Sequence, residues 1–392
     1  LAAPSLRVEA PVPGRSVVGV EVPNEEIGLV TLRSVMESEP FRSLGVPLTV
    51  ALGEDVAGSP VAADLGLMPH LLIAGTTGSG KSVCIKAMAT CLAMTNRPRE
   101  LRMVMIDPKM VELVRFNGLP HLLGHTEVEL DRIGRVLRWV AHEMDERYKK
   151  FAAVSARHLD DYNNKVGRRQ PEEWLPRIVV LIDELADLML LAPEETERTI
   201  CRVAQMARAT GVHLVVATQR PSTDVVTGLI KANFPARISF ATASQVDSRV
   251  ILDMPGAETL LGRGDMLYLA ADAGHPVRVQ GCYVSEEEIQ RVVDFWRRQM
   301  PGWPAEAPWE SMMREPAGEA VAESGDQDGG LLEQAIQLVR MRKTISASYL
   351  QRRLRIGYPR AARLMEQLEE MGLVGPPEAA GRPRRVIGGD GD

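Results

Sequence analysis

Residues Gly75 to Ser82, GTTGSGKS, have the types and spacing needed to hold a nucleoside triphosphate. They fit the pattern G-x-x-x-x-G-K-[ST] at every fixed position. Glycines let backbone N–H groups curl around phosphates, and the N-terminus of a following helix adds a positive dipole. We expect Lys81 to reach the β- and γ-phosphates and Ser82 to coordinate Mg²⁺, so ATP and Mg²⁺ are the predicted ligands. The predicted nucleotide contacts are Gly75, Thr76, Thr77, Gly78, Ser79, Gly80, Lys81, Ser82 and Val83.

The elements on either side of this loop are those that the motif requires. The apolar run His70 to Ala74 predicts a buried strand, and Val83 to Met94 has apolar residues at helical spacing. A glycine-rich turn with a chance lysine is the alternative, and it does not explain this strand–loop–helix context.

A second group of chemically competent residues ends the apolar segment RIVVLIDELADLM. Val179 to Ile182 predicts a buried strand of the Walker B type, followed directly by two carboxylates. Asp183 would hold Mg²⁺, through water, and Glu184 would polarise the attacking water. Because open α/β sheets bind ligands at the carboxyl ends of their strands, both carboxylates should lie beside the glycine loop. Many strands simply end in acids, so this motif is informative only together with the loop.

Two further positions are candidates for reading the γ-phosphate. Gln219 ends another apolar strand in ATQR, where it is either a sensor or part of a turn before Pro221. Arg208, in AQMARATG, could supply positive charge to the γ-phosphate of a neighbouring subunit. By composition it is better explained as an arginine near the negative end of a helix dipole.

The pattern of the chain predicts an α/β fold with a mainly parallel sheet, because several strands are continuous apolar runs. Between them, Glu127 to Phe151 is amphipathic and predicts a surface helix. The candidate strands are His70–Ala74, Leu101–Ile106, Ile178–Ile182, Val212–Thr218, Ala236–Ala241 and Asp265–Ala270.

Four regions are predicted. Residues 1–60 form a small α/β subdomain with a helix from Asn24 to Glu37, and residues 61–300 form the ATPase domain. Residues 301–329 are an acidic linker rich in Pro and Gly. Residues 330–392 contain three short helices, Leu331–Met341, Ser346–Leu354 and Pro359–Gly372, then two strands around a basic loop, which is the winged-helix pattern.

The distribution of charge supports this division. The net charge of the chain is −6, but residues 331–392 have eleven Lys and Arg against seven Asp and Glu. A small basic domain behind an acidic linker is typical of nucleic-acid binding. The four cysteines show no metal-ligand or disulfide spacing, so a reducing compartment is expected. No uninterrupted apolar stretch of about 18 residues exists that would span a membrane.

In its motifs the chain resembles the motor region of the FtsK/SpoIIIE family of bacterial DNA translocases. The matching blocks are MPHLLIAGTTGSGKSV, MIDPKMVEL, VVLIDELADLM, ARATGVHLVVATQRPSTDVVTGLIKANFPARISF and DSRVILDMPGAETLLGRGDMLY. The N-terminal PGRSVVGVEVPN resembles the start of the family's α subdomain, and RIGYPRAARLMEQLEEMGLV resembles its γ winged helix. The resemblance covers nearly the whole chain and implies a RecA-like P-loop ATPase.

The resemblance also implies a function. Such proteins form hexameric rings around double-stranded DNA and convert ATP hydrolysis into translocation during chromosome segregation and cell division. Lys81, Ser82, Asp183 and Glu184 match the family's nucleotide-site residues, and Arg208 matches its inter-subunit arginine. DNA phosphates would be contacted by Arg220, Lys231 and Arg249. Relatives often have lysine near Gln245, so this chain is expected to make one phosphate contact fewer.

For the winged helix, the resemblance favours reading of G-rich orientation motifs in DNA over a merely solvated helix face. The recognition helix would begin at Pro359, where relatives often have a polar residue. Arg363 suits guanine and Glu366 suits the cytosine amino group, and both share a helix face with Pro359. The remaining residues expected to bind DNA are Arg360, Arg382, Arg384 and Arg385.

Further partners are implied only by the family. The γ domain would contact a site-specific tyrosine recombinase, and the protein would work at the cytoplasmic face of the bacterial inner membrane. Because the sequence begins at Leu1 rather than at a methionine, we expect a fragment or processed product whose membrane anchor lies upstream.

Three other classes of protein are less favoured. A transcription activator with a C-terminal helix-turn-helix should contain a GAFTGA-like loop, and none is found. A conjugative or plasmid transfer ATPase shares the motor core but does not explain the winged helix. A DNA-binding scaffold that does not hydrolyse ATP would not need the intact set of Lys81, Asp183 and Glu184.

Overall fold

The computed structural model divides the chain into two compact units, Leu1–Met312 and Met313–Asp392. Each unit is described by itself. The residues that the structure describes are 7–9, 17–22, 24, 28–302, 306–311, 332, 334–339, 342, 344–354, 358–375 and 384–387.

The first unit is built on one nine-stranded sheet with the strand order β4-β3-β11-β10-β9-β5-β8-β7-β6. The five strands from β9 to β6 are parallel, and the remaining pairings are antiparallel. The bounds are β3 Thr49–Asp55, β4 Pro60–Asp64, β5 His70–Ala74, β6 Leu101–Ile106, β7 Arg177–Ile182, β8 Val212–Thr218, β9 Ala236–Phe240, β10 Asp265–Leu269 and β11 Val277–Gly281.

All six predicted strands are present, within one residue at each end. Every residue of β5 and β8 is buried, as continuous apolar runs in a sheet covered on both faces predict. The boundary expected after residue 60 falls at the first residue of β4, and both β3 and β4 belong to the same sheet as β5, which leads into the glycine loop. A separate antiparallel pair is formed by β1, Arg7–Glu9, and β2, Gly19–Glu21.

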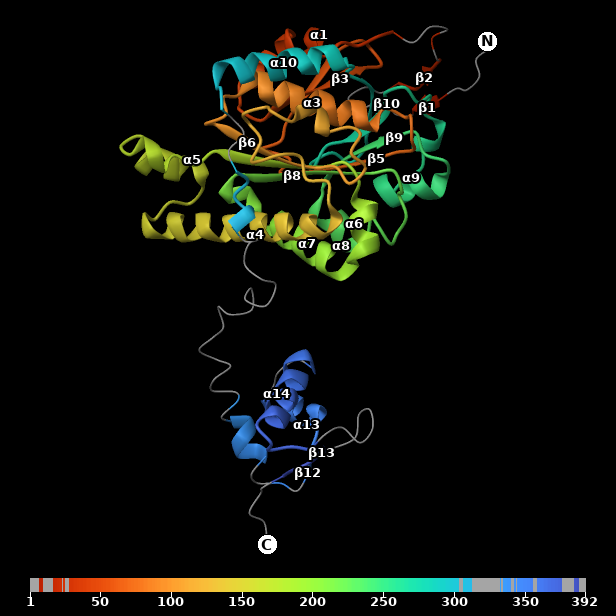
Figure 1. Ribbon diagram of the computed structural model, residues 1–392. Helices are drawn as coiled ribbons and strands as arrows, with labels where there is room; N and C mark the ends of the chain where they lie inside the picture. Colours follow the sequence, from red (N-terminus) through yellow and green to blue (C-terminus); the bar gives the residue numbers. More distant parts are fainter. Residues whose placement is uncertain are drawn as a thin grey trace. The chain divides into compact units, whose positions relative to one another are not determined.

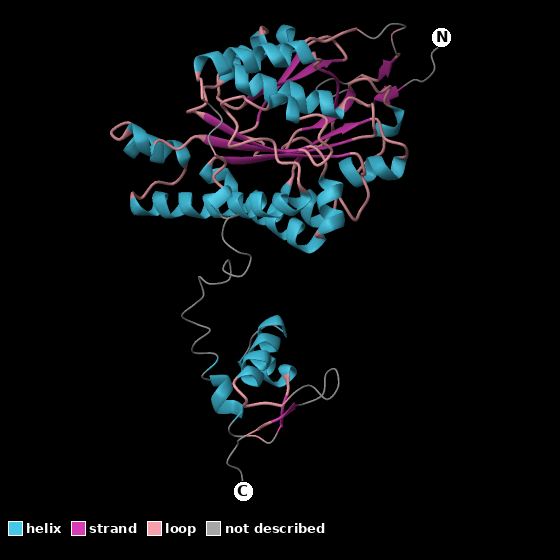
Figure 2. Cartoon of the chain, in the orientation of Figure 1, coloured by secondary structure: helices cyan, strands magenta, loops and turns pink. Residues whose placement is uncertain are grey.

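Helices cover both faces of the sheet (Figures 1 and 2). Figure 1 shows α1, α3 and α10 on one face and α4, α7 and α8 on the other. The predicted amphipathic helix is α4, whose buried residues include Ile133, Val140 and Met144. The α-helices of this unit are α1 Leu32–Met36, α2 Glu39–Leu44, α3 Lys81–Thr95, α4 Leu130–Ala153, α5 Leu159–Tyr162, α6 Leu185–Leu191, α7 Pro193–Thr210, α8 Gly228–Asn233, α9 Gln245–Leu252 and α10 Glu286–Gln299.

The helix predicted from Asn24 to Glu37 is wrong at the described residues 24 and 28–31, and residues 25–27 lie outside the described part of the chain. The helix begins at Leu32, because the Thr31 side chain accepts the hydrogen bond of the Ser34 N–H and caps it. Residues 28–30 are not helical. Tyr283 holds this segment extended: its N–H donates to the Val30 carbonyl, and its carbonyl accepts from the Leu32 N–H. Pairing with a distant segment therefore overrides the local pattern.

The start of the predicted linker lies against the first unit. Trp309 is 1% exposed and packs on Trp139, with 5.4 Å between the ring centroids. Glu310 forms an ion pair with Arg132 near the start of α4. The composition of this segment does not predict a buried residue, because Trp309 is buried by contact with α4 and not by residues near it in the sequence.

The second unit has the elements of a winged helix. Residues 334–339 are helical, and α13, Ala347–Leu354, packs on α14, Tyr358–Glu370. The strand β12, Thr344–Ile345, pairs antiparallel with β13, Arg384–Arg385. A small apolar core joins them, and its buried residues are Ala335, Val339, Ile345, Leu350, Ala361, Leu364, Met365, Leu368 and Val374.

All four cysteines lie in the described part of the chain, are buried and form no disulfide. Among the described residues, no helix is long and apolar enough to cross a membrane.

Two buried histidines predict a pH dependence of stability. Burial lowers the pKa of His70 to about 3 and that of His213 to about 4, both from an ordinary 6.5. Because the folded pKa values are depressed, protonation favours the unfolded chain. The two neutral histidines should therefore make their full contribution to the free energy of unfolding above about pH 6.5, and this contribution should fall as the pH drops towards 4. The melting temperature should be lower at about pH 5 than at about pH 7.5.

The variant His70→Asn should show a smaller pH-dependent fall. An asparagine oxygen can replace the ring nitrogen that accepts the Leu214 N–H, and it does not titrate. The same substitution at the exposed His125 is the control. Equal falls in the wild type and the His70 variant would contradict the assignment.

Candidate nucleotide site

The glycine loop joins β5 to α3 in a conformation that needs glycine. Gly78 has φ +76° and Gly80 has φ +118°, a region that L side chains rarely adopt. A Cβ on Gly80 would also lie 2.7 Å from the Cα of Gly264. The Gly264 N–H donates to the Ser79 carbonyl, so the segment before β10 packs directly on the loop. The loop is thus held by the sheet's antiparallel half.

Lys81 is the first residue of α3, and its side chain is only 3% exposed. Its Nζ donates to the carbonyl oxygen of Asp183 at 2.6 Å and to Oδ1 of the same residue at 2.8 Å. Asp183 directly follows β7, so the ion pair spans the intervening strand β8. A buried ammonium group must be paired, and in this arrangement Asp183 takes the place that phosphate oxygens would occupy.

Only one of the two carboxylate oxygens of Asp183, Oδ1, is hydrogen-bonded to Lys81. Oδ2 is buried, and no hydrogen-bond partner is recorded for it among the described residues. Burial raises the pKa of Asp183, the Lys81 ammonium opposes this, and the charges of Asp107 and Glu112 add to it. The described residues contain no group of three or more His, Cys, Asp or Glu that could hold a metal ion by protein ligands alone. The donor set therefore fits Mg²⁺ bound jointly by protein and phosphate, with the Ser82 hydroxyl and Asp183 on the protein side.

Glu184 is 1% exposed and accepts hydrogen bonds at both carboxylate oxygens. Thr218 Oγ1 donates to Oε1 at 2.7 Å, and the Gln219 N–H donates to the same oxygen at 3.1 Å. Lys109 Nζ donates to Oε2 at 2.8 Å. Burial raises the pKa of Glu184, but the hydrogen bonds from Lys109 and Thr218 outweigh it, so the pKa lies below its ordinary value. The carboxylate is therefore ionised near neutral pH, which is the form that can accept a proton.

Gln219 follows β8 and lies against the glycine loop. The Thr77 hydroxyl donates to its side-chain oxygen at 2.8 Å. The ends of β5, β7 and β8 therefore bring together Lys81, Asp183, Glu184 and Gln219, as the predicted convergence of parallel strand ends requires.

Sequence reasoning missed Lys109 and Glu112, two charged residues of this site that lie in MIDPKMVEL after β6. A third charged residue of the same block, Asp107, positions them. Asp107 Oδ2 accepts the N–H groups of Val111, Glu112 and Leu113, which fixes the turn. The turn directs Lys109 to Glu184. Glu112 hydrogen-bonds Ser82 and forms an ion pair with Lys86. The available signal was their position directly after a predicted strand of the parallel sheet.

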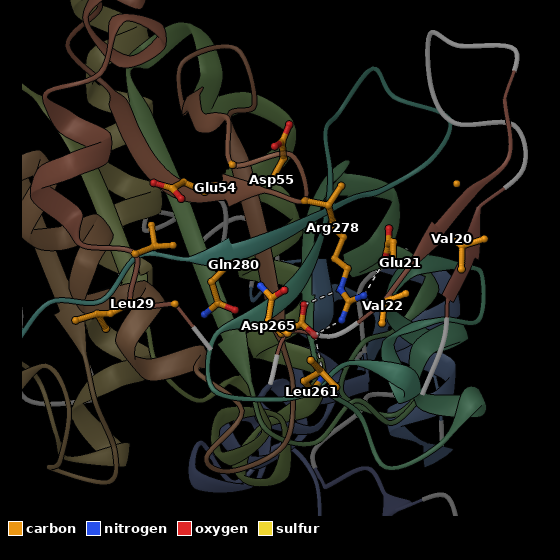
Figure 3. Close-up of a pocket in the computed structure, with 16 residues that line it drawn as sticks. Val20, Glu21, Val22, Leu29, Glu54, Asp55, Leu261, Asp265, Arg278 and Gln280 are labelled. Atoms are coloured by element: carbon orange, nitrogen blue, oxygen red, sulfur yellow. Dashed lines mark hydrogen bonds and ion pairs between the residues drawn. The ribbon is translucent and has the colours of Figure 1, made fainter. Parts of the chain in front are cut away.

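A cavity of about 510 Å³ lies over the loop. Its lining includes Thr76 to Gly78 and Gly80 to Cys84 from the loop and α3, together with Gln219, Phe240, Arg263 and Tyr283. A second cavity, of about 740 Å³, shares Gly28, Leu29, Val30 and Gln280 with it (Figure 3). In Figure 3 the Arg278 guanidinium points between Asp265 and Glu21, at 2.7 and 2.6 Å, and so ties β2 to the sheet.

Arg208 lies in the last turn of α7 and is exposed. The chain continues through Gly211 into the start of β8, whereas the nucleotide site lies at the other end of that strand. A seven-residue strand spans roughly 20 Å, so Arg208 cannot reach the glycine loop of its own chain.

The three residues predicted to contact DNA phosphates differ in their surroundings. Arg220 and Arg249 are exposed. Lys231 is mostly buried and forms an ion pair with Asp253 at 2.8 Å, which also pairs with Arg237. Gln245, where relatives often have lysine, is exposed at the start of α9.

In the second unit, Pro359, Arg360 and Arg363 lie on α14, but their side chains are outside the described residues, as is the whole of Arg382. Glu366 is exposed. In β13, Arg384 forms an ion pair with Glu369 of α14, whereas Arg385 is exposed. Of the two wing arginines that the structure describes, Arg384 is engaged in an internal contact and Arg385 faces solvent.

A glycine loop after β5 with carboxylates after β7 defines a P-loop ATPase fold. Solved structures agree. The cytoplasmic domain of the type VII secretion ATPase EccC from Thermomonospora curvata is 27% identical, with a TM-score of 0.61 over 71% of this chain and 35% of that one. The conjugation coupling protein TcpA of pCW3 is 24% identical, with a TM-score of 0.59 over 74% of this chain and 80% of that one, which shows a shared fold.

The chain belongs to the FtsK/SpoIIIE family. The family's model matches residues 31–223, and the model of the FtsK γ domain matches residues 326–388. DNA translocase FtsK of Caldanaerobacter subterraneus subsp. tengcongensis is 50% identical over 387 residues, which are 99% of this chain and 53% of that protein. DNA translocase SpoIIIE of Bacillus subtilis is 48% identical over 394 residues, or 99% of this chain and 49% of that protein. The chain thus spans about half the length of these relatives.

Replacing Lys81 tests the site directly. Lys81→Met should weaken ATP binding about 10- to 100-fold, because a charge-assisted hydrogen bond contributes about 1.5–3 kcal/mol. Isothermal titration with a slowly hydrolysed ATP analogue measures this affinity. Lys150→Met is the matched control, since Lys150 is exposed near the end of α4 and is not among the residues of the site. Unchanged affinity in the Lys81 variant would refute the phosphate-loop assignment.

Proposed function

We propose that the chain is the motor of an ATP-driven double-stranded DNA translocase. The observation that carries this proposal is the meeting of Lys81, Asp183, Glu184 and Gln219 at one buried edge of the sheet. These are the groups that phosphoryl transfer needs to bind the phosphates, hold the metal and orient water. Membership of a family whose relatives are named DNA translocases supports DNA as the track.

Hydrolysis would begin with an exchange of partners at Lys81. The ammonium leaves Asp183 for the β- and γ-phosphates, while the backbone N–H groups of the glycine loop and the start of α3 bind the remaining oxygens. Ser82 and Asp183 would hold Mg²⁺, which would supply positive charge to neutralise that of the phosphates. Glu184 accepts a proton from the attacking water, and Gln219 contacts the γ-phosphate.

The active unit would be a homo-hexameric ring. Arg208 lies at the end of β8 away from the nucleotide site of its own chain, so it suits a neighbour's γ-phosphate. An arginine supplied in trans couples hydrolysis in one subunit to the position of the next. This geometry favours a function for Arg208 beyond that of a helix-end charge.

DNA would pass through the ring and touch it through its phosphates. Arg220 follows the sensor strand β8 directly, and Arg249 is exposed on α9. Lys231 would first have to leave Asp253. Contacts to phosphates give affinity without reading sequence, which a motor that moves over any sequence requires.

The second unit would read the orientation of the DNA. Arg363 and Glu366 on α14 would contact base edges, with Arg360, Arg382, Arg384 and Arg385 on the phosphates. Arg384 is paired with Glu369, so Arg385 is the stronger phosphate contact of the two. The same unit would contact a tyrosine recombinase in chromosome segregation at cell division. A membrane anchor at the inner membrane would come from segments outside this sequence.

A conjugative transfer ATPase is the second candidate, because TcpA shares the fold. That likeness concerns the fold alone. The curated relatives that match 99% of this chain carry the name DNA translocase, and the γ-domain match favours the same function.

ATP hydrolysis should be strongly stimulated by long linear duplex DNA. Glu184→Gln should bind ATP and reduce turnover by about 100-fold or more, because positioned general bases contribute that much. Steady-state phosphate release with and without duplex measures both effects. Hydrolysis that is indifferent to duplex would contradict a DNA-coupled motor, and normal turnover in the variant would mean that another group is the base.

The base-reading function of α14 has its own test. Arg363→Ala should lose about 1–3 kcal/mol of discrimination for the preferred DNA motif, while affinity for unrelated duplex stays nearly the same. The preferred motif is found by selection from a random duplex library. Fluorescence anisotropy on matched and scrambled duplexes then measures the discrimination, with Arg385→Ala as the comparison that should weaken both equally. Equal losses on both duplexes with Arg363→Ala would make it a phosphate contact.

A further inference from the structure

Lys109 is a charged residue that touches the proposed base and that the reaction scheme above does not use. It lies two residues after Asp107, at the carboxyl end of β6, in a turn fixed by three backbone N–H bonds to Asp107 Oδ2. Its Nζ lies 2.8 Å from Oε2 of Glu184. The other charged groups that act on this ammonium are Asp183 and Asp187.

Both carboxylate oxygens of Glu184 already accept hydrogen bonds, so little acceptor capacity is left for a water molecule. Oε1 already accepts from the Thr218 hydroxyl and from the N–H groups of Gln219 and Ala186. Oε2 accepts from Lys109 at 2.8 Å and, more weakly, from the Gln219 N–H at 3.3 Å. Because a base must accept its proton from the attacking water at one of these oxygens, one donor has to leave before hydrolysis.

Lys109 is the donor that can leave most easily. Thr218 is fully buried and the Gln219 N–H is fixed by the end of β8. The Lys109 side chain is 38% exposed, so solvent can replace its partner, whereas the Glu184 side chain is 2% exposed. Departure of Lys109 would therefore leave Oε2 with only the longer hydrogen bond from the Gln219 N–H.

We propose that Lys109 is a positioning residue that holds Glu184 in a closed arrangement, and that this ion pair must open before Glu184 activates water. The inference rests on the proposed function of Glu184 as the base. In this proposal, the turn 107–113 restrains ATP hydrolysis until both nucleotide and DNA are bound.

Kinetics test the restraint. Lys109→Met keeps the length of the side chain and removes its charge. The DNA-free kcat should rise by roughly 2- to 5-fold, because a partly exposed ion pair contributes up to about 1 kcal/mol, while KM for ATP stays within about twofold. The ratio of stimulation by duplex should fall in proportion. Lys109→Arg should restore the wild-type values, and Lys150→Met, at an exposed surface position, should change nothing. An unchanged or lower DNA-free kcat in Lys109→Met would overturn the proposal.

A second measurement needs no turnover. Acetylation of lysines by an amine-reactive ester, read by mass spectrometry without nucleotide, should modify Lys109 slowly in the wild type. In Glu184→Gln it should proceed several-fold faster relative to the exposed Lys150, because a charged partner no longer protects the amine. Equal modification in both proteins would overturn the ion pair. If the wild type hydrolysed no ATP, the proposed function would fail, and this labelling would still decide whether Lys109 is paired with Glu184.

Discussion

The buried ion pair between Lys81 and Asp183 is the contact on which the rest of the site depends. It joins the glycine loop after β5 to the end of β7 across β8, with both side chains almost completely buried. A buried ammonium or carboxylate without its partner costs several kcal/mol, so these three strands must end at the same level. The register of the parallel strands supplies this, since β8 pairs with β5 on one side and β7 on the other.

We propose that the same geometry allows charged partners to be exchanged at this site. Lys81 is paired with Asp183 and Lys109 with Glu184, so each of the two carboxylates that follow β7 has a cation of its own chain as partner. In the proposed function, phosphates would compete with Asp183 for Lys81, and the attacking water would compete with Lys109 for Glu184. Oδ2 of Asp183 has no hydrogen-bond partner among the described residues, and a metal ion would bind at this oxygen. Nucleotide binding and hydrolysis would then be two successive exchanges of partners.

Much of this could be predicted from sequence because it depends on local patterns. The glycine loop, the carboxylates after β7 and Gln219 all follow buried apolar strands, and parallel strands align their ends. What failed depends on distant contacts. The helix before Glu37 is shortened by pairing with Tyr283, and Trp309 is buried by α4 rather than by its neighbours in sequence. Lys109 and Glu112 were missed because only the fixed turn at Asp107 directs them to the site. The pairing of Arg384 with Glu369 likewise depends on how β13 packs beside α14.

The central claim is that ATP turnover at this site moves the chain along duplex DNA. Displacement of a third strand bound to one end of a long linear duplex tests it most directly. The account predicts that the wild type releases the third strand with ATP and that Glu184→Gln does not. Release should also become slower as the duplex between loading region and third strand is lengthened. Duplex-stimulated hydrolysis without release of the third strand would contradict the claim, because the energy of ATP would then not be converted into movement.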